Sequence, residues 1–125
     1  MILCVERDPH VRDLEAYFLT EAGFQVTVAA DGIEAFELVR TLRPAIVVTE
    51  ILVPKLDGLA LCRRLKADEA TKDTAILDFS LLAAEDRARD AGADAFLRKP
   101  LSAQRLTDTV RQLLADPHSI PDGTP

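Results

Sequence analysis

The chain has 125 residues, 48% of them hydrophobic and 29% charged, which is typical of one globular domain with its own core. Its formal net charge is −6 at pH 7, so it lacks the positive charge that binds a phosphate backbone, and we expect no direct nucleic-acid partner. Cys4 and Cys62 lie in apolar runs and are interpreted as buried free thiols in a reducing compartment. The apolar start, residues 1–5, is too short for a signal peptide or a membrane span, which predicts a cytoplasmic protein without a membrane partner.

Short apolar runs and helix-capping residues alternate along the chain and predict five strands and five helices. Strands are expected where Ile, Val, Leu and Phe gather or alternate with polar residues, at 2–5, 24–28, 45–49, 75–79 and 95–97. Helices are expected where apolar residues recur at a spacing of three and four, at 9–22, 32–43, 58–65, 84–91 and 103–114. Four residues are expected to cap helix starts: Asp8, Asp31, Asp57 and Ser102.

The regular alternation of strands and helices predicts the fold class. Such a chain forms a doubly wound α/β domain, with a parallel sheet covered by helices on both faces and joined by right-handed crossovers. We expect this domain to occupy residues 1–115. Residues 116–125 contain three prolines and a glycine without any apolar period, which predicts a tail or the stub of a linker.

Polar side chains follow the predicted strands at one edge of the sheet. Glu6 and Arg7 come after the first strand, Glu50 after the third, Ser80 at the end of the fourth and Lys99 after the fifth. Ligands of open parallel sheets gather beyond the carboxyl ends of the strands, so we expect these side chains to form one site around Glu50. The alternative is that Glu50 is a solvated residue that closes a strand.

Three segments carry motifs in the order, and at the elements, that one protein family shows. They are AADGIEA at 29–35, PKLDG at 54–58 and AGADAFLRKP at 91–100. Together they resemble the receiver domain of two-component response regulators, of the CheY-like superfamily, over residues 2 to about 115. The resemblance implies a flavodoxin-like fold of five helices and five parallel strands in the order 2-1-3-4-5.

The resemblance also implies roles for the residues at the polar edge. In this family an aspartate after the third strand accepts a phosphoryl group, and two acids after the first strand help to hold Mg²⁺. A lysine and a Ser or Thr bind the phosphoryl oxygens, and an aromatic residue of the fifth strand moves with them. By position, Glu6 matches the first acid, Ser80 the hydroxyl, Lys99 the lysine and Phe96 the switch aromatic. The alternative for Phe96 is a plain core residue.

Two positions depart from the family pattern. Glu50 occupies the phosphoacceptor position, and its extra methylene moves the carboxylate by roughly 1.5 Å, when about 1 Å of misplacement can cost on the order of 100-fold in rate. Arg7 occupies the position of the second acid, where a fixed cation repels Mg²⁺. We therefore expect a degenerate site without bound Mg²⁺ and without conventional phosphorylation.

A count of charges suggests that the two departures belong together. Glu6 and Glu50 would face Arg7 and Lys99, which gives a neutral site without a metal ion. Our hypothesis is that Arg7 takes the place of the metal and that Glu50 pairs with Lys99 or Arg7, in weak imitation of the phosphorylated state. The alternative is drift in a receiver that lost its chemistry, with Arg7 pointing into solvent.

Two further departures concern the fourth strand and helix. The segment from Ser80 to Gly92 is shorter than the family usually has, which predicts a short fourth helix. Asp78 falls in the fourth strand, where an apolar residue is usual, so it must find a hydrogen-bond donor or lie near the rim.

These observations favour a non-enzymatic receiver that acts as a protein-interaction module. By resemblance, a signalling partner would bind the face of the fourth helix, fifth strand and fifth helix, and a second copy of the chain is another candidate partner. The alternative function is a phosphorylation-competent, Mg²⁺-dependent receiver of a phosphorelay. A flavodoxin-like cofactor binder is disfavoured because the turn at 6–9 has no glycine and Pro9 has no N–H for a phosphate.

Overall fold

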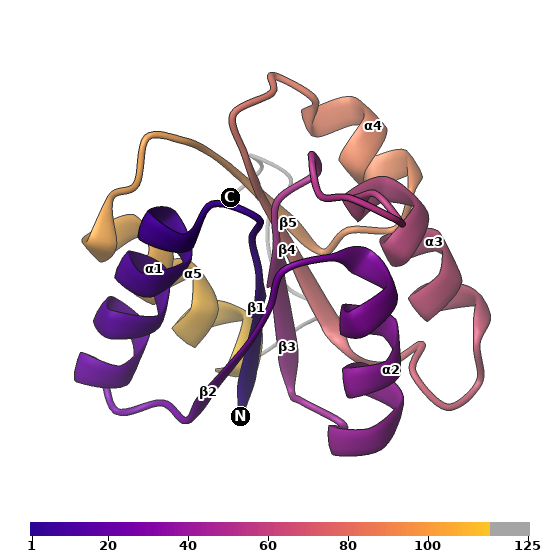
Figure 1. Cartoon of the computed structure of the whole chain (residues 1–125), viewed down its shortest axis with the longest axis horizontal. Helices are drawn as coiled ribbons and strands as arrows, with labels where there is room; N and C mark the ends of the chain where they lie inside the picture. The colour runs from indigo at the N-terminus through magenta and orange to yellow at the C-terminus, as the bar shows by residue number, and fades with distance from the viewer. Residues whose placement is uncertain (116–125) are drawn as a thin grey trace.

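A parallel five-stranded sheet forms the centre of the structure, a computed structural model that describes residues 1–115 (Figure 1). The strands are β1 (Ile2–Val5), β2 (Val26–Ala29), β3 (Ile46–Thr49), β4 (Ala75–Ser80) and β5 (Ala95–Arg98). The helices are α1 (Pro9–Glu21), α2 (Gly32–Leu42), α3 (Gly58–Ala67), α4 (Glu85–Asp90) and α5 (Ala103–Ala115). The strand order is β2-β1-β3-β4-β5, which confirms the predicted fold class and topology. The predicted tail, 116–125, lies outside the described residues.

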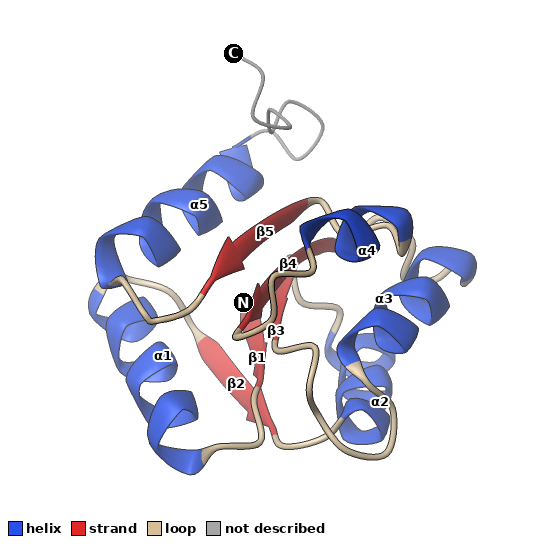
Figure 2. Ribbon diagram, turned by 90° about the horizontal axis from the view of Figure 1, so that it is seen from above, coloured by secondary structure: helices blue, strands red, loops and turns tan. Residues whose placement is uncertain are grey.

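The helices form a layer on each face of the sheet. Helices α1 and α5 cover one face, and α2, α3 and α4 cover the other (Figure 2). Successive strand residues alternate between these layers, so that Cys4 packs in the cluster under α1 and α5 while Leu3 packs in the cluster under α2 and α3. Cys4 and Cys62 are buried free thiols, as predicted. Among the helices of residues 1–115, none combines the length and the hydropathy that a membrane span requires.

The predicted helix starts are confirmed by their hydrogen bonds. Carboxylates at the N-caps accept from backbone N–H groups of the first turn, with distances of 2.9 Å at Asp8, 2.8 Å at Asp31 and 2.8 Å at Asp57. The Ser102 hydroxyl accepts from the backbone N–H of Arg105 at 3.3 Å. These bonds satisfy donors that helix geometry leaves without a partner.

The largest difference from the predicted strand boundaries is at the start of β2, while the other strand ends agree within one residue. Strand β2 begins at Val26 and not at residue 24, because the backbone N–H of Phe24 donates to the carbonyl of Leu19 at 3.1 Å and keeps Phe24 in the turn after α1. Gly23 has a φ of +99°, a conformation that favours glycine, and completes this turn. The predicted short fourth helix is confirmed, since α4 has only six residues.

Asp78 lies in the middle of β4, and the prediction that it finds a donor or lies near the rim is wrong. Its exposed fraction is 0%, and neither carboxyl oxygen has a hydrogen-bond partner within residues 1–115. Burial, together with the negative charge of Glu50, raises the pKa of Asp78 to about 8. The side chain therefore avoids the cost of a buried charge by keeping its proton at neutral pH.

Replacement of Asp78 by leucine, an apolar residue of similar size, tests this assignment. The folded-state pKa lies above the unfolded value, so the wild-type protein loses stability as the pH rises from about 4 to about 8. We expect Asp78→Leu to raise the free energy of unfolding at pH 7, because it removes a buried unpaired polar group, and we expect its difference from the wild type to be roughly 3–4 kcal/mol less favourable at pH 4. Urea denaturation at the two pH values measures both. A destabilised variant at pH 7 would contradict the assignment.

Candidate functional site

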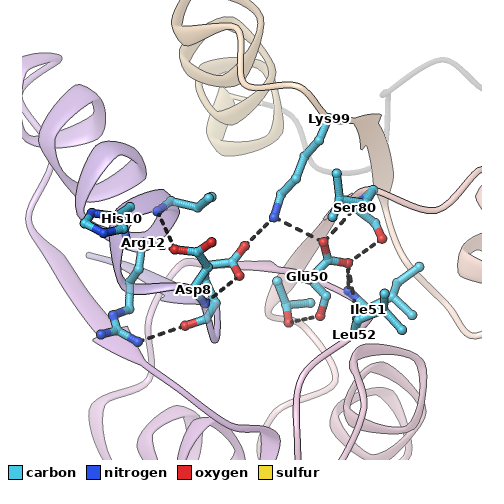
Figure 3. A network of polar contacts seen from close by, with 12 residues as sticks. Asp8, His10, Arg12, Glu50, Ile51, Leu52, Ser80 and Lys99 are labelled. Carbon is cyan, nitrogen blue, oxygen red and sulfur yellow. Dashed lines mark hydrogen bonds and ion pairs between the residues drawn. The ribbon is translucent and has the colours of Figure 1, made fainter.

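Four of the predicted site residues meet at the carboxyl edge of the sheet. Glu6 follows β1, Glu50 follows β3, Ser80 ends β4 and Lys99 follows β5, and all four side chains are buried. Figure 3 shows Lys99 reaching across the edge toward Glu50, with Ser80 on the opposite side of that carboxylate. The arrangement follows from the parallel topology, because neighbouring strands end at the same edge.

The Glu50 carboxylate is surrounded by donors of the chain itself. Its Oε2 atom accepts from the Ser80 hydroxyl and from the backbone N–H groups of Ile51, at 2.6 Å, and Leu52, at 3.1 Å. Its Oε1 atom accepts from the backbone N–H of Leu81 at 3.1 Å. Both oxygens are therefore satisfied without any group from outside the chain.

Lys99 joins the two acids of the site. Its ammonium group forms an ion pair with Glu6 Oε1 and another, at 3.1 Å, with Glu50 Oε1. Burial opposes the charged form of Lys99, but the bond to Glu6 and the charge of Glu50 outweigh it and raise the pKa. Burial likewise opposes the charge of Glu50, yet the bonds from Ser80 and Leu52 and the charge of Lys99 lower its pKa. Both shifts favour the charged forms of Lys99 and Glu50.

Arg7 does not take part in this site, which corrects our hypothesis that it replaces the metal ion. Its side chain is exposed and forms no hydrogen bond or ion pair with any of residues 1–115. Glu6 is buried, and its carboxylate also accepts from the backbone N–H of Asp8 at 3.0 Å, whereas Arg7 lies at a bend after β1 and is exposed. Among the described residues, Lys99 is therefore the one cation that faces Glu6 and Glu50, so the site keeps one net negative charge and is not neutral as the count of charges predicted.

Family resemblance implies a Mg²⁺ ion at this edge, and the residues present do not fit one. Both carboxylates are engaged by Lys99, and Arg7 supplies no oxygen ligand. Within residues 1–115, no group of three His, Cys, Asp or Glu side chains is placed to share a metal ion.

Glu15 is a buried acid near the site that the sequence analysis missed. It lies on α1 with an exposed fraction of 1%. Burial raises its pKa to about 8; the charge of Lys99 lowers the pKa, and the charges of Glu6 and Glu50 raise it. A signal was available, because Glu15 is four residues from both Val11 and Leu19 on the apolar stripe of the helix.

Phe96 lies apart from the polar cluster. Its half-buried ring lines a pocket of about 470 Å³ between β5 and the start of α4, together with Ala83, Ala84 and Arg98. Phe96 is the register partner of Asp78 on the neighbouring strand. The predicted switch position thus borders the surface of α4 and not the Glu50 carboxylate.

Comparison with known proteins identifies the family. The sequence matches the response regulator receiver domain over residues 2–111. The chain belongs to this family. Over 123 residues the receiver is 36% identical to the DNA-binding dual master transcriptional regulator RpaA of Synechocystis sp., an alignment that covers 96% of the chain and 51% of RpaA. It therefore spans about half the length of that relative.

Solved structures agree with this membership. The receiver domain of a signal transduction histidine kinase from Syntrophus aciditrophicus superposes with a TM-score of 0.86 at 29% identity, covering 99% of this receiver and 96% of that chain. The receiver domain of the sensor histidine kinase PA1611 from Pseudomonas aeruginosa gives 0.85 at 25% identity, covering 92% and 97%, and holds a magnesium ion in its active site cleft. Response regulator receivers belong to two-component signal transduction.

Removal of the Lys99 charge tests the role of the ion pairs. Lys99→Met leaves Glu6 and Glu50 buried without a cation, and we expect the free energy of unfolding at pH 7 to fall by roughly 3–5 kcal/mol. The matched control is the double variant Lys99→Met/Glu6→Gln, which removes one of the facing charges and should recover part of the loss. Urea denaturation measures both variants. A loss below about 1 kcal/mol, or a double variant no more stable than the single one, would contradict the proposed role.

A second prediction concerns the proton on Glu15. Its folded-state pKa lies above the unfolded value, so its contribution to stability declines as the pH rises from about 4.5 to about 8. We expect Glu15→Gln to match the wild type near pH 5, apart from a constant offset, and to gain roughly 3–4 kcal/mol relative to it by pH 8, which is about 1.4 kcal/mol per pH unit. Denaturation curves across this range give the comparison, and parallel pH profiles of the two proteins would refute the prediction.

Proposed function

We propose that this receiver signals by binding a protein partner, without conventional phosphorylation at residue 50. The observation that carries the proposal is the Lys99 ammonium, which is bonded to the carboxylates of both Glu6 and Glu50. In phosphorylating relatives the corresponding acids are available to a metal ion and to the incoming phosphoryl group. Here both acids are bonded to one lysine of the chain itself, and Arg7 supplies no third acid.

The contacts of Glu50 support a second part of the proposal, an imitation of the phosphorylated state. By family resemblance, the hydroxyl and lysine at the positions of Ser80 and Lys99 bind phosphoryl oxygens. In this receiver both bind the Glu50 carboxylate. The side chain of glutamate is longer than that of aspartate, so its carboxylate reaches donors that an aspartate would leave to the phosphoryl group. The receiver would then stay in a conformation that resembles the phosphorylated one.

The proposed partner surface consists of α4, β5 and α5. The pocket beside Phe96 lies on this surface and combines apolar side chains with charges of both signs, from Glu85, Asp86, Arg87 and Arg98. A signalling protein or a second copy of the chain would bind there. RpaA is described as DNA-binding, but the net charge of −6 favours a domain that does not itself bind nucleic acid.

Incubation with acetyl phosphate and Mg²⁺, followed by intact mass spectrometry, tests the proposal. We expect no stable gain of phosphate by the wild-type chain. The matched variant is Arg7→Asp/Glu50→Asp, which restores the acid and the phosphoacceptor of the family pattern. We expect this variant to gain one phosphate, because the shorter side chain at position 50 frees the donors at the edge and the new carboxylate at position 7 would supply a metal ligand.

A stable gain of one phosphate by the wild type would overturn the proposal and favour the alternative, a phosphorylation-competent receiver. Failure of the double variant to gain phosphate, with its fold intact by circular dichroism, would show that features besides residues 7 and 50 have removed the chemistry.

A further inference from the structure

Asp78 is a buried acid that the proposed function leaves unused. It has no hydrogen-bond partner within residues 1–115, and neither neighbouring strand provides one. On β3 it is paired with Thr49, whose hydroxyl donates to the Glu50 carbonyl at 3.0 Å. On β5 it is paired with Phe96, which has no polar atom in its side chain. Buried polar groups of proteins are nearly always satisfied, so this exception requires an explanation.

Helix α4 is the weakly held element on the same side of the sheet. Asp78 shares its face of β4 with Ile76, in the layer that α2, α3 and α4 cover (Figure 2). Helix α4 has six residues, Ala88 is its one buried residue, and its N-cap, Ala84, makes no side-chain cap bond. So short a helix depends on packing for its stability, and an alanine methyl group contributes little of it. The pocket of about 470 Å³ between α4 and β5 leaves room for movement.

The titratable groups that face Asp78 do not neutralise it. Glu50, at the end of β3, is negative, and the Cys62 thiol of α3 keeps its proton because burial raises its pKa to about 12. Ala88 is the buried residue of α4, and Phe96 is the residue of β5 beside Asp78; neither side chain is titratable. Charged side chains of α4 and β5 line the outer pocket instead: Glu85, Asp86, Arg87 and Arg98. No cation therefore reaches Asp78 from the described elements around it.

We propose that α4 opens away from the sheet together with release of the Asp78 proton, so that this receiver responds to pH at the face where its partner binds. The inference rests on the proposed function only in naming that face as the partner surface. With α4 closed, the carboxyl group is dry and neutral. With α4 open, water reaches the carboxyl group, which loses its proton to solvent and is stabilised as the anion. A rise in pH then favours the open form.

The sign and size of the effect follow from linkage. The closed form keeps the proton up to about pH 8, whereas an exposed aspartate ionises near its ordinary value. Opening thus releases one proton between about pH 4 and 8, and its equilibrium constant rises about tenfold per pH unit. Above about pH 8 both forms are ionised and the dependence levels off.

Hydrogen exchange with mass spectrometry, on the full chain without phosphodonor or partner, tests the inference. Amides of residues 84–91 are followed from pH 6 to 9 and corrected for the chemical exchange rate. We expect their corrected exchange to rise about tenfold per pH unit up to about pH 8 and then to level off. Asp78→Leu and Asp78→Asn should both lose this rise, because neither side chain can release a proton. Leucine replaces the carboxyl group with an apolar group, and asparagine keeps its shape and polarity.

Glu15→Gln is the matched control, because Glu15 titrates in the same range but lies on α1, on the opposite face of the sheet. This variant should keep the full response of α4. The inference is overturned if the wild type shows no corrected rise at α4 or if Asp78→Leu retains it. Global stability also falls as the pH rises, so the α4 amides must exchange faster than those of α1 and α5 at each pH, and equal corrected rates in the three helices would indicate global unfolding and overturn the inference as well. None of these outcomes depends on whether residue 50 accepts phosphate.

Discussion

The Lys99 ammonium, held between the carboxylates of Glu6 and Glu50, is the interaction on which the polar edge of this sheet depends. Two buried carboxylates side by side repel each other strongly where water is scarce, and one of them would take up a proton if no cation were present. Lys99 is itself nearly buried, with a side-chain exposed fraction of 6%, and is stable as a cation only because both acids face it. The three charges therefore stabilise one another, and no incoming group is needed to satisfy them.

The charge of Glu50 also affects two buried acids, one on each face of the sheet. Glu15 lies on α1 and Asp78 on the opposite face, toward α3 and α4; burial raises the pKa of both, and the negative charge of Glu50 raises it further. Each is an acid at a position that packs against apolar neighbours, and each is neutral at pH 7. Acids at such positions cost stability as the pH rises, and their protons are therefore variables to which the fold responds.

The fold could be predicted from the sequence because periodicity and capping are local, and because alternating strands and helices permit few topologies. The meeting of Glu6, Glu50 and Lys99 followed from that topology. Arg7 could not be placed, since the direction of a side chain just beyond a strand end depends on how its neighbour is bonded. Glu15 could have been found, because an acid four residues from Val11 and Leu19 interrupts an apolar stripe. The strand order alone did not reveal that Asp78 lacks a donor, because Thr49 had to be seen bonding elsewhere.

A crystal structure of the wild-type chain grown with Mg²⁺ and beryllofluoride tests most directly whether the site is closed to phosphoryl chemistry. Beryllofluoride occupies the place of a phosphoryl group beside the acceptor carboxylate and requires the neighbouring metal ion. We predict that Lys99 remains bonded to Glu6 and Glu50, with neither species bound at residue 50. Density for Mg²⁺ and beryllofluoride beside Glu50, with Lys99 withdrawn from Glu6, would contradict the account.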